Sequence, residues 1–133
     1  MKLFLTCTVA LLFALKSIGS TPPTTYKYVV QFNSECCGVP DAAPLLKCID
    51  AFKKKYKIKK LSYDLIAPMG REGEYYMAFG LKELNKTQTA LFIKQLDATT
   101  LKMKDKGSAT TEQNMLIDPA SLSSRTTIIK KTL

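Results

Sequence analysis

Residues 26–33 read YKYVVQFN, a stretch of β-branched and aromatic residues in which the apolar positions alternate. Such alternation is typical of a β-strand that turns one face towards a hydrophobic core. Tyr28, Val30 and Phe32 share one face of this strand, and Val29 lies on the other. The neighbouring sequence must therefore supply an element that covers the Tyr28 face.

The segment that follows predicts an amphipathic helix over residues 42–56. Asp41 is suited to cap its start, and Pro44 falls in the first turn, where a missing N–H costs no hydrogen bond. Apolar residues recur at spacings of three and four along one side of this helix. They are Leu45, Cys48, Ile49, Phe52 and Tyr56. We expect this stripe to pack against the sheet.

Two further strands are predicted by the same alternation, over residues 61–67 and 75–81. The segment between them, PMGREGE at 68–74, contains proline, two glycines and charged residues, which are typical of a turn. We therefore expect these two strands to form a hairpin with a long loop.

A second helix is predicted to begin after Asn85. Asn85 and Gln88 have the spacing of a capping box, in which each side chain bonds to the other residue's backbone N–H. The helix should run to about Leu101 or beyond. Its buried side should carry Phe92, Ile93, Leu96 and Met103.

The element order is β-α-β-β-α, followed by a strand near 114–118 or 125–130, between which the sequence does not decide. This is the order of a ferredoxin-like βαββαβ sandwich, an α+β fold with a four-stranded antiparallel sheet and two helices on one face. We predict one such domain over residues 26–118. Residues 119–133 would form a C-terminal tail or an extra strand.

The first nineteen residues are typical of a secretory signal peptide. Lys2 precedes an almost wholly apolar run at 3–15, and small residues follow at 17–20. The apolar run is too short to cross a bilayer, which needs about 20 residues. We expect a secreted or periplasmic protein with no stable membrane span, whose residues 20–25 form a mobile leader.

The chain is basic, with a formal net charge of +9, and lysines are concentrated between 53 and 60. Basic proteins adhere to acidic surfaces, so binding to polyanions or lipid headgroups through this cluster is one possible function. A solvated helix end is the preferred interpretation of the cluster, because cations complement the C-terminal end of the helix dipole. We expect no nucleic-acid partner, since the cluster lacks an interleaved aromatic face and a secreted protein has little access to nucleic acid.

Most catalytic chemistry is improbable for this chain. It contains no histidine, so the usual general base near neutral pH is missing. The acidic residues do not pair at spacings that suggest acid–base catalysis, and no glycine-rich phosphate loop is present. We therefore expect a protein that is not an enzyme and needs no cofactor.

Three of the four cysteines, Cys36, Cys37 and Cys48, lie close together in the sequence. Export favours a disulfide, and we expect Cys48 to pair with Cys36 or Cys37. A bond between the two adjacent cysteines is the least favoured pairing, because it strains the peptide that joins them. The alternatives are disulfide exchange and a soft metal site for an ion such as copper or zinc.

The leading interpretation is a small exported domain that binds an unknown protein or small ligand. One candidate surface is the sheet face away from the helices, with Val29, Ala78 and Gly80. The other is the 68–74 loop, with Arg71 and Glu72. The alternative is an extracytoplasmic thiol protein that binds a soft metal or exchanges disulfides through its three cysteines.

Overall fold

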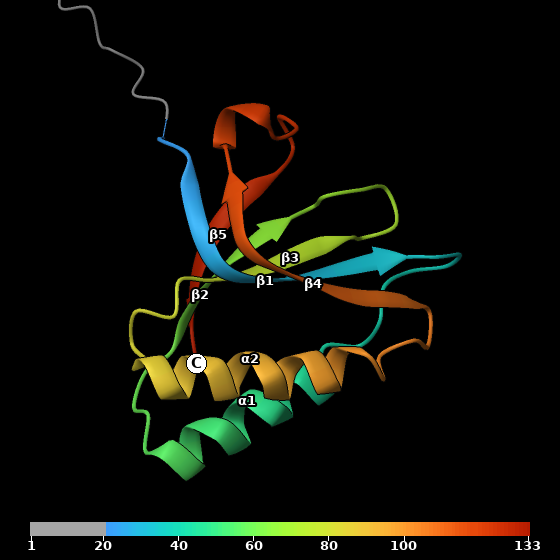
Figure 1. Cartoon of the computed structure of the whole chain (residues 1–133). Helices are drawn as coiled ribbons and strands as arrows, with labels where there is room; N and C mark the ends of the chain where they lie inside the picture. The colour runs from blue at the N-terminus through green and yellow to red at the C-terminus, as the bar shows by residue number, and fades with distance from the viewer. Residues whose placement is uncertain (1–20) are drawn as a thin grey trace, which may run out of the picture.

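The computed structural model describes residues 21–133 (Figure 1). Residues 1–20, on which the predicted signal peptide falls, lie outside the described residues. In chain order the elements are β1 (Thr24–Ser34), α1 (Ala43–Tyr56), β2 (Ser62–Ala67), β3 (Tyr75–Phe79), α2 (Lys86–Thr100), β4 (Gly107–Ile117), the 3-10 turn η1 (Pro119–Ser121) and β5 (Thr127–Thr132). Each strand and helix expected from the sequence is present, and most ends agree within a few residues, but the strand expected near 114–118 already begins at Gly107.

The strands form one antiparallel sheet in the order β4-β1-β3-β2-β5. Both helices lie on the same face of this sheet (Figure 1). The predicted α+β class is therefore confirmed, but the prediction of four strands is wrong. The sequence offered two places for the last strand, and both form strands: β4 pairs with β1 at one edge and β5 pairs with β2 at the other.

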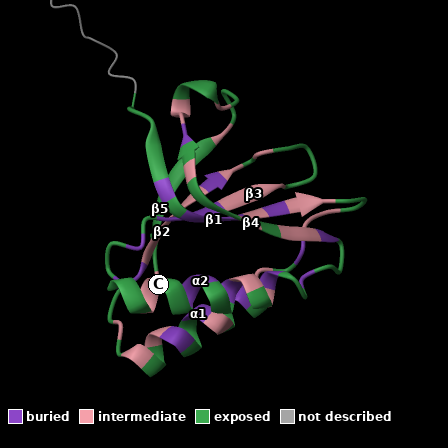
Figure 2. Ribbon diagram, in the orientation of Figure 1, coloured by how far each residue is buried: buried purple, intermediate pink, exposed green. Residues whose placement is uncertain are grey.

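The main core lies between the sheet and the two helices, where the buried parts of both layers face each other (Figure 2). The pairing of β1 with β3 sets Tyr28 beside Phe79 and Val30 beside Met77, so the apolar faces of both strands coincide. From the helices, Leu45, Ile49, Phe52, Phe92, Ile93 and Leu96 are buried against these strands. The apolar stripes expected on both helices are thus the surfaces that contact the sheet.

Phe92 lies at the centre of this core and is fully buried. Its ring centroid is 5.2 Å from that of Phe52, 5.6 Å from that of Phe79 and 6.4 Å from that of Tyr28, and all three pairs meet edge to face. Aromatic pairs in this arrangement contribute beyond their buried area. Phe92 therefore joins α2 to α1 and to the two central strands.

One polar group crosses the boundary between the helices and the sheet. The carboxylate of Asp97 on α2 accepts hydrogen bonds from the Tyr28 hydroxyl and from the Thr111 hydroxyl, each at 2.8 Å. Burial and the bond to Asp97 raise the pKa of Tyr28 well above its ordinary value. Asp97 thereby ties α2 to both β1 and β4.

The two helices begin differently. The capping box at the start of α2 is confirmed, since Asn85 and Gln88 exchange side-chain to backbone hydrogen bonds of 2.8 and 3.0 Å. In α1 the cap position is Ala42 rather than Asp41. Asp41 still accepts a bond from the Ala43 N–H at 2.9 Å, one residue outside the expected position.

β1 and β4 change the face that they turn to the helices near Lys27. Residues two apart normally share a face of a strand, yet Tyr28 packs under the helices and Tyr26 packs in a second cluster on the far side. The pairing is interrupted between Lys27 and Asn114, and Asn114 has a φ of 55°, which asparagine tolerates better than most residues. The strand pair therefore bends sharply at this point (Figure 1).

We expect the Phe92→Ala variant to lose about 3–5 kcal/mol of unfolding free energy, because it removes the ring on which four elements converge. Urea denaturation followed by circular dichroism measures this loss. Leu91→Ala is the control, since Leu91 is 38% exposed on the other side of the same helix and should cost less than about 1 kcal/mol. Equal losses in the two variants would contradict the central position of Phe92.

Asp97→Ala should cost about 1–3 kcal/mol, because it leaves the Tyr28 and Thr111 hydroxyls without their acceptor. The same denaturation experiment measures it, with the exposed Asp50→Ala as control, which should stay within about 0.5 kcal/mol of the parent. In the Tyr28→Phe background, removing Asp97 should cost less. A loss no larger than that of the control would show that Asp97 does not join the layers.

Candidate functional site

The structure pairs the three cysteines differently from the favoured prediction. Cys36 and Cys37, adjacent and exposed in the loop after β1, form a disulfide, and Cys48 is a free, half-buried thiol. The predicted bond from Cys48 to Cys36 or Cys37 is therefore wrong. The reason is the direction of Cys48, whose sulfur points across to α2 and lies 3.9 Å from the carbonyl oxygen of Gln95.

The three sulfur atoms do not form a common site. Among residues 21–133, no three His, Cys, Asp or Glu side chains lie close enough together to hold a metal ion. A soft metal site made of Cys36, Cys37 and Cys48 would need both an opened disulfide and a turned Cys48 side chain.

The sheet face away from the helices is not the open surface that the sequence suggested. Val29 and Ala78 are 0% and 1% exposed and belong to the second apolar cluster, so the prediction that they lie on an accessible binding surface is wrong. Segments after β2 and after β4 cover them, with Met69 and Leu122 packed against the cluster. Alternation in a strand shows which residues share a face, but not whether a distant loop folds over it.

Other members of the predicted surfaces are accessible. Gly80 is exposed at the end of β3, and Arg71 and Glu72 are exposed in the 68–74 loop. The backbone N–H of Glu72 donates to the Glu74 carboxylate at 2.9 Å, which orders the tip of the loop. Gly80 also lines a small hollow of about 200 Å³, whereas Arg71 and Glu72 are candidates by exposure alone.

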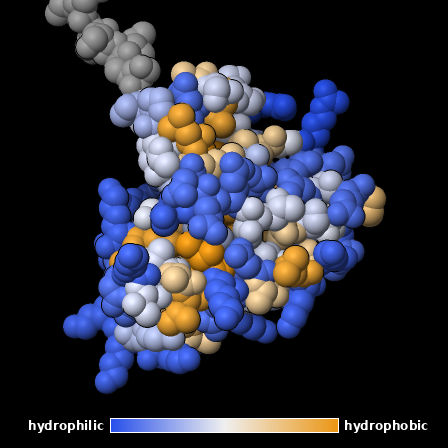
Figure 3. Space-filling model, viewed as in Figure 1, coloured by the Kyte–Doolittle hydropathy of each residue, from blue (hydrophilic) through white to orange (hydrophobic). Residues whose placement is uncertain are grey.

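The lysine cluster lies at the C-terminal end of α1, as the helix-end interpretation predicts. Lys53, Lys54 and Lys55 form the last turn, and Lys57 ends it in a left-handed conformation. Hydrophilic side chains extend outward from this end of the molecule (Figure 3). Their position complements the exposed carbonyl groups of the helix end.

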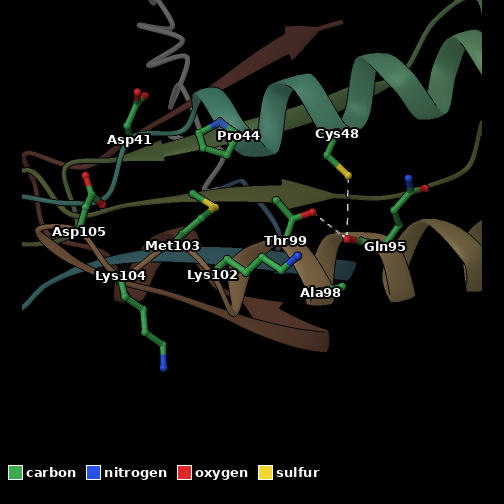
Figure 4. Close-up of a pocket in the computed structure, with 10 residues that line it drawn as sticks. All are labelled: Asp41, Pro44, Cys48, Gln95, Ala98, Thr99, Lys102, Met103, Lys104 and Asp105. Atoms are coloured by element: carbon green, nitrogen blue, oxygen red, sulfur yellow. Dashed lines mark hydrogen bonds between the residues drawn. The ribbon is translucent and has the colours of Figure 1, made fainter.

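A hollow with a volume of about 530 Å³ lies between α1 and α2. The start of α1, the second half of α2 and the loop after α2 enclose it (Figure 4). Its lining residues are Asp41, Pro44, Cys48, Gln95, Ala98, Thr99, Lys102, Met103, Lys104 and Asp105. We call this hollow the interhelical groove.

The interior of the interhelical groove is mainly apolar. Pro44 on α1 and Met103 after α2 face each other across it, and Cys48 points inward (Figure 4). The carbonyl oxygen of Gln95 accepts bonds from the Thr99 hydroxyl at 2.9 Å and from the Cys48 thiol. Asp41 and Lys104 point away from the space, so their charges stay at its rim (Figure 4).

The sequence did not reveal the groove, although it contained one signal for it, since Ala98 is a small residue that leaves room between the helices. Only the structure shows that α2 ends at Thr100, which places Met103 in the following loop rather than on the helix. Met103 is still buried, as the stripe predicted, and so closes one end of the space.

Comparisons with protein-family models, with curated proteins and with solved structures found no match for this chain. The function of the groove is therefore argued from its own residues. Neither helix of residues 21–133 has the length and apolar character that crossing a membrane requires.

Iodoacetamide applied to the folded protein without reductant should modify Cys48 slowly and leave Cys36 and Cys37 unmodified. Half-burial limits access to Cys48, and the disulfide protects the other two. After treatment with dithiothreitol, both adjacent cysteines should become modified. Mass spectrometry of tryptic peptides measures each site, and a peptide crosslinked through Cys48 would contradict this arrangement.

Proposed function

We propose that this protein is a small, exported, non-catalytic binding domain and that its ligand site is the interhelical groove. The observation that carries the proposal is a mainly apolar space of about 530 Å³ between two helices. This volume lies in the range of about 300–1,000 Å³ typical of small-molecule sites, which are apolar with few polar groups. The chain's lack of histidine supports a role in binding rather than catalysis.

The lining favours a compact, largely apolar ligand with one negatively charged end. Pro44, Ala98 and Met103 offer apolar contact, and the Cys48 thiol adds a polarisable group. Lys102 lies along the groove and is the cation placed to meet an anionic group (Figure 4). We infer that small aromatic acids are suitable first probes.

Two further parts of the proposal concern the fold and the location. We infer that β1 to β4 and the two helices form a ferredoxin-like βαββαβ unit to which β5 is added. The spatial order β4-β1-β3-β2 with antiparallel pairing supports this. The signal-peptide pattern of the first nineteen residues supports export.

A thiol function is the second candidate. The observation that favours it is the exposure of the Cys36–Cys37 disulfide in the loop that leads to Asp41 at the rim of the groove. External thiols could reach this bond. Titrating the reduced protein with Cu(I) tests the metal version: a complex of fixed stoichiometry that protects all three thiols from alkylation would favour it over the groove.

We expect Ala98→Trp to abolish ligand binding, because the indole fills the space between the helices. Amide chemical shifts of the parent protein should change around Cys48 and Ala98 when a set of aromatic carboxylic acids is screened by NMR. Ala51→Trp is the matched control, since Ala51 is exposed on α1 outside the groove lining, and it should bind as the parent does.

Two results would contradict the proposed site. One is the absence of any acid that shifts the groove amides. The other is binding that survives Ala98→Trp, which would place the ligand elsewhere on the molecule.

A further inference from the structure

The strand β5 is exposed to an unusual degree for part of a sheet. Among residues 21–133 it pairs only with β2, so no described strand pairs with its outer edge, and all six of its residues are exposed. An edge strand with free N–H and C=O groups is a template for pairing with another chain. Long edge strands in soluble proteins are commonly shortened, bulged or covered.

Two large apolar side chains lie on this exposed strand. Ile129 is 47% exposed and is paired with Leu65, on the face that carries the helices. Ile128 is 37% exposed and is paired with Ile66, on the opposite face. β5 therefore offers apolar contact on both sides of the sheet.

A shallow hollow lies on each face of the sheet. On the helix side a space of about 290 Å³ lies over β2 and β3, and its lining residues, which include Leu46, Tyr63 and Leu65, contain none from β5. On the far side a space of about 420 Å³ is lined by residues that include Ile128 and Leu122. Because side chains of a strand point alternately to the two faces, a sixth strand would present apolar groups to both sides.

The charge of this edge indicates which kind of strand fits it. Residues 125–131 contain Arg125, Lys130 and Lys131 and no acidic residue. Lys130 is paired with Asp64. Burial raises the pKa of Glu83, but hydrogen bonds from Ser62 and the charge of Lys130 lower it by more, so the net pKa is below its ordinary value. The charge of Lys130 is therefore partly matched by these two acidic residues. Lys131 is paired with Tyr63 and has no acid opposite it.

More positive charge lies at the same end of the sheet. Lys59 and Lys60 come just before Leu61, whose backbone exchanges hydrogen bonds of 2.9 and 3.3 Å with Leu133. Two copies of β5 side by side would bring all these cations together, so lysine at this edge opposes self-pairing. Acidic side chains opposite the same lysines would be favourable, because opposite charges across a strand pair stabilise it.

We propose that the outer edge of β5 is a docking site for an extended, acidic segment of a partner protein, which joins the sheet as a sixth strand. The backbone of the segment would supply the hydrogen bonds, its apolar residues would contact Ile128 and Ile129, and its carboxylates would select the lysine-bearing edge. This site is separate from the interhelical groove, and neither proposal depends on the other.

The test uses a blocked synthetic peptide of about eight residues, a usual strand length, in which pairs of valines alternate with pairs of glutamates, so that each face of the strand carries both residue types. NMR titration should shift amides of β5 and β2, and added salt should weaken the binding. Lys131→Glu should raise the dissociation constant on the order of fivefold, as expected for reversing one cross-strand charge pair. Lys94→Glu, an exposed lysine of α2 outside the lining of the interhelical groove, is the matched control and should have little effect.

A second peptide with lysine in place of every glutamate should not bind the parent protein but should gain affinity for the Lys131→Glu variant. Equal binding of both peptides would overturn the acidic specificity, and shifts confined to other elements would overturn the site. The alternative occupant of the β5 edge is a second copy of the chain, which sedimentation velocity tests. A parent protein that is a dimer, and that Ile129→Lys converts to a monomer, would show that β5 pairs with a second copy and would overturn the proposal.

Discussion

Phe92 of α2 contacts rings from α1, β1 and β3, and the two layers of the fold meet at this point. The three rings come from positions far apart in the sequence, and the periodicity of each helix or strand determines that its ring faces the core. A helix places one residue in three or four on the sheet, and a strand places every second residue under the helices. Phe92 can meet Tyr28 and Phe79 only because the β1–β3 register sets those two residues side by side. The orientation of α2 therefore depends on the sheet, and Asp97, one turn further along the same helix, fixes it with two hydrogen bonds.

The orientation of α2 in turn creates the interhelical groove. With its large side chains turned to the sheet, α2 presents Gln95, Ala98 and Thr99 to the side, next to Cys48 of α1. None of these side chains is large enough to close the space between the helices. The thiol that the sequence assigned to a disulfide is thus directed towards the neighbouring helix. The disulfide forms instead in the loop before α1, where the two adjacent cysteines have no other cysteine facing them among the described residues.

Much of the fold could be predicted from the sequence, because hydrophobic periodicity and capping are local properties. The strand around Tyr28, the apolar stripe around Phe52 and the capping box at Asn85 all act over a few residues. The fifth strand, the burial of Val29 and the change of face at Asn114 depend on contacts between distant segments. β5 in particular has the weak pattern of a strand exposed on both faces, and its pairing with β2 joins residues 60 to 70 positions apart. The candidate site was missed for the same reason. A groove forms where the side chains of two elements leave space between them, and the sequence of one element alone does not show this.

The exposure of β5 follows from the widths of the two layers. Packed helices lie about 8–10 Å apart, and neighbouring strands lie about 4.8 Å apart, so two helices cover about four strands. The described sheet has five, with both helices over the main core between β4 and β2. β5 lies beyond the part of the sheet that the helices cover, so no helix buries its isoleucines. The lysines of β5 oppose pairing of its edge with another copy of the chain. An uncovered, charged edge strand is thus a geometric consequence of adding one strand to a two-helix layer, and its cations decide which partners that edge accepts.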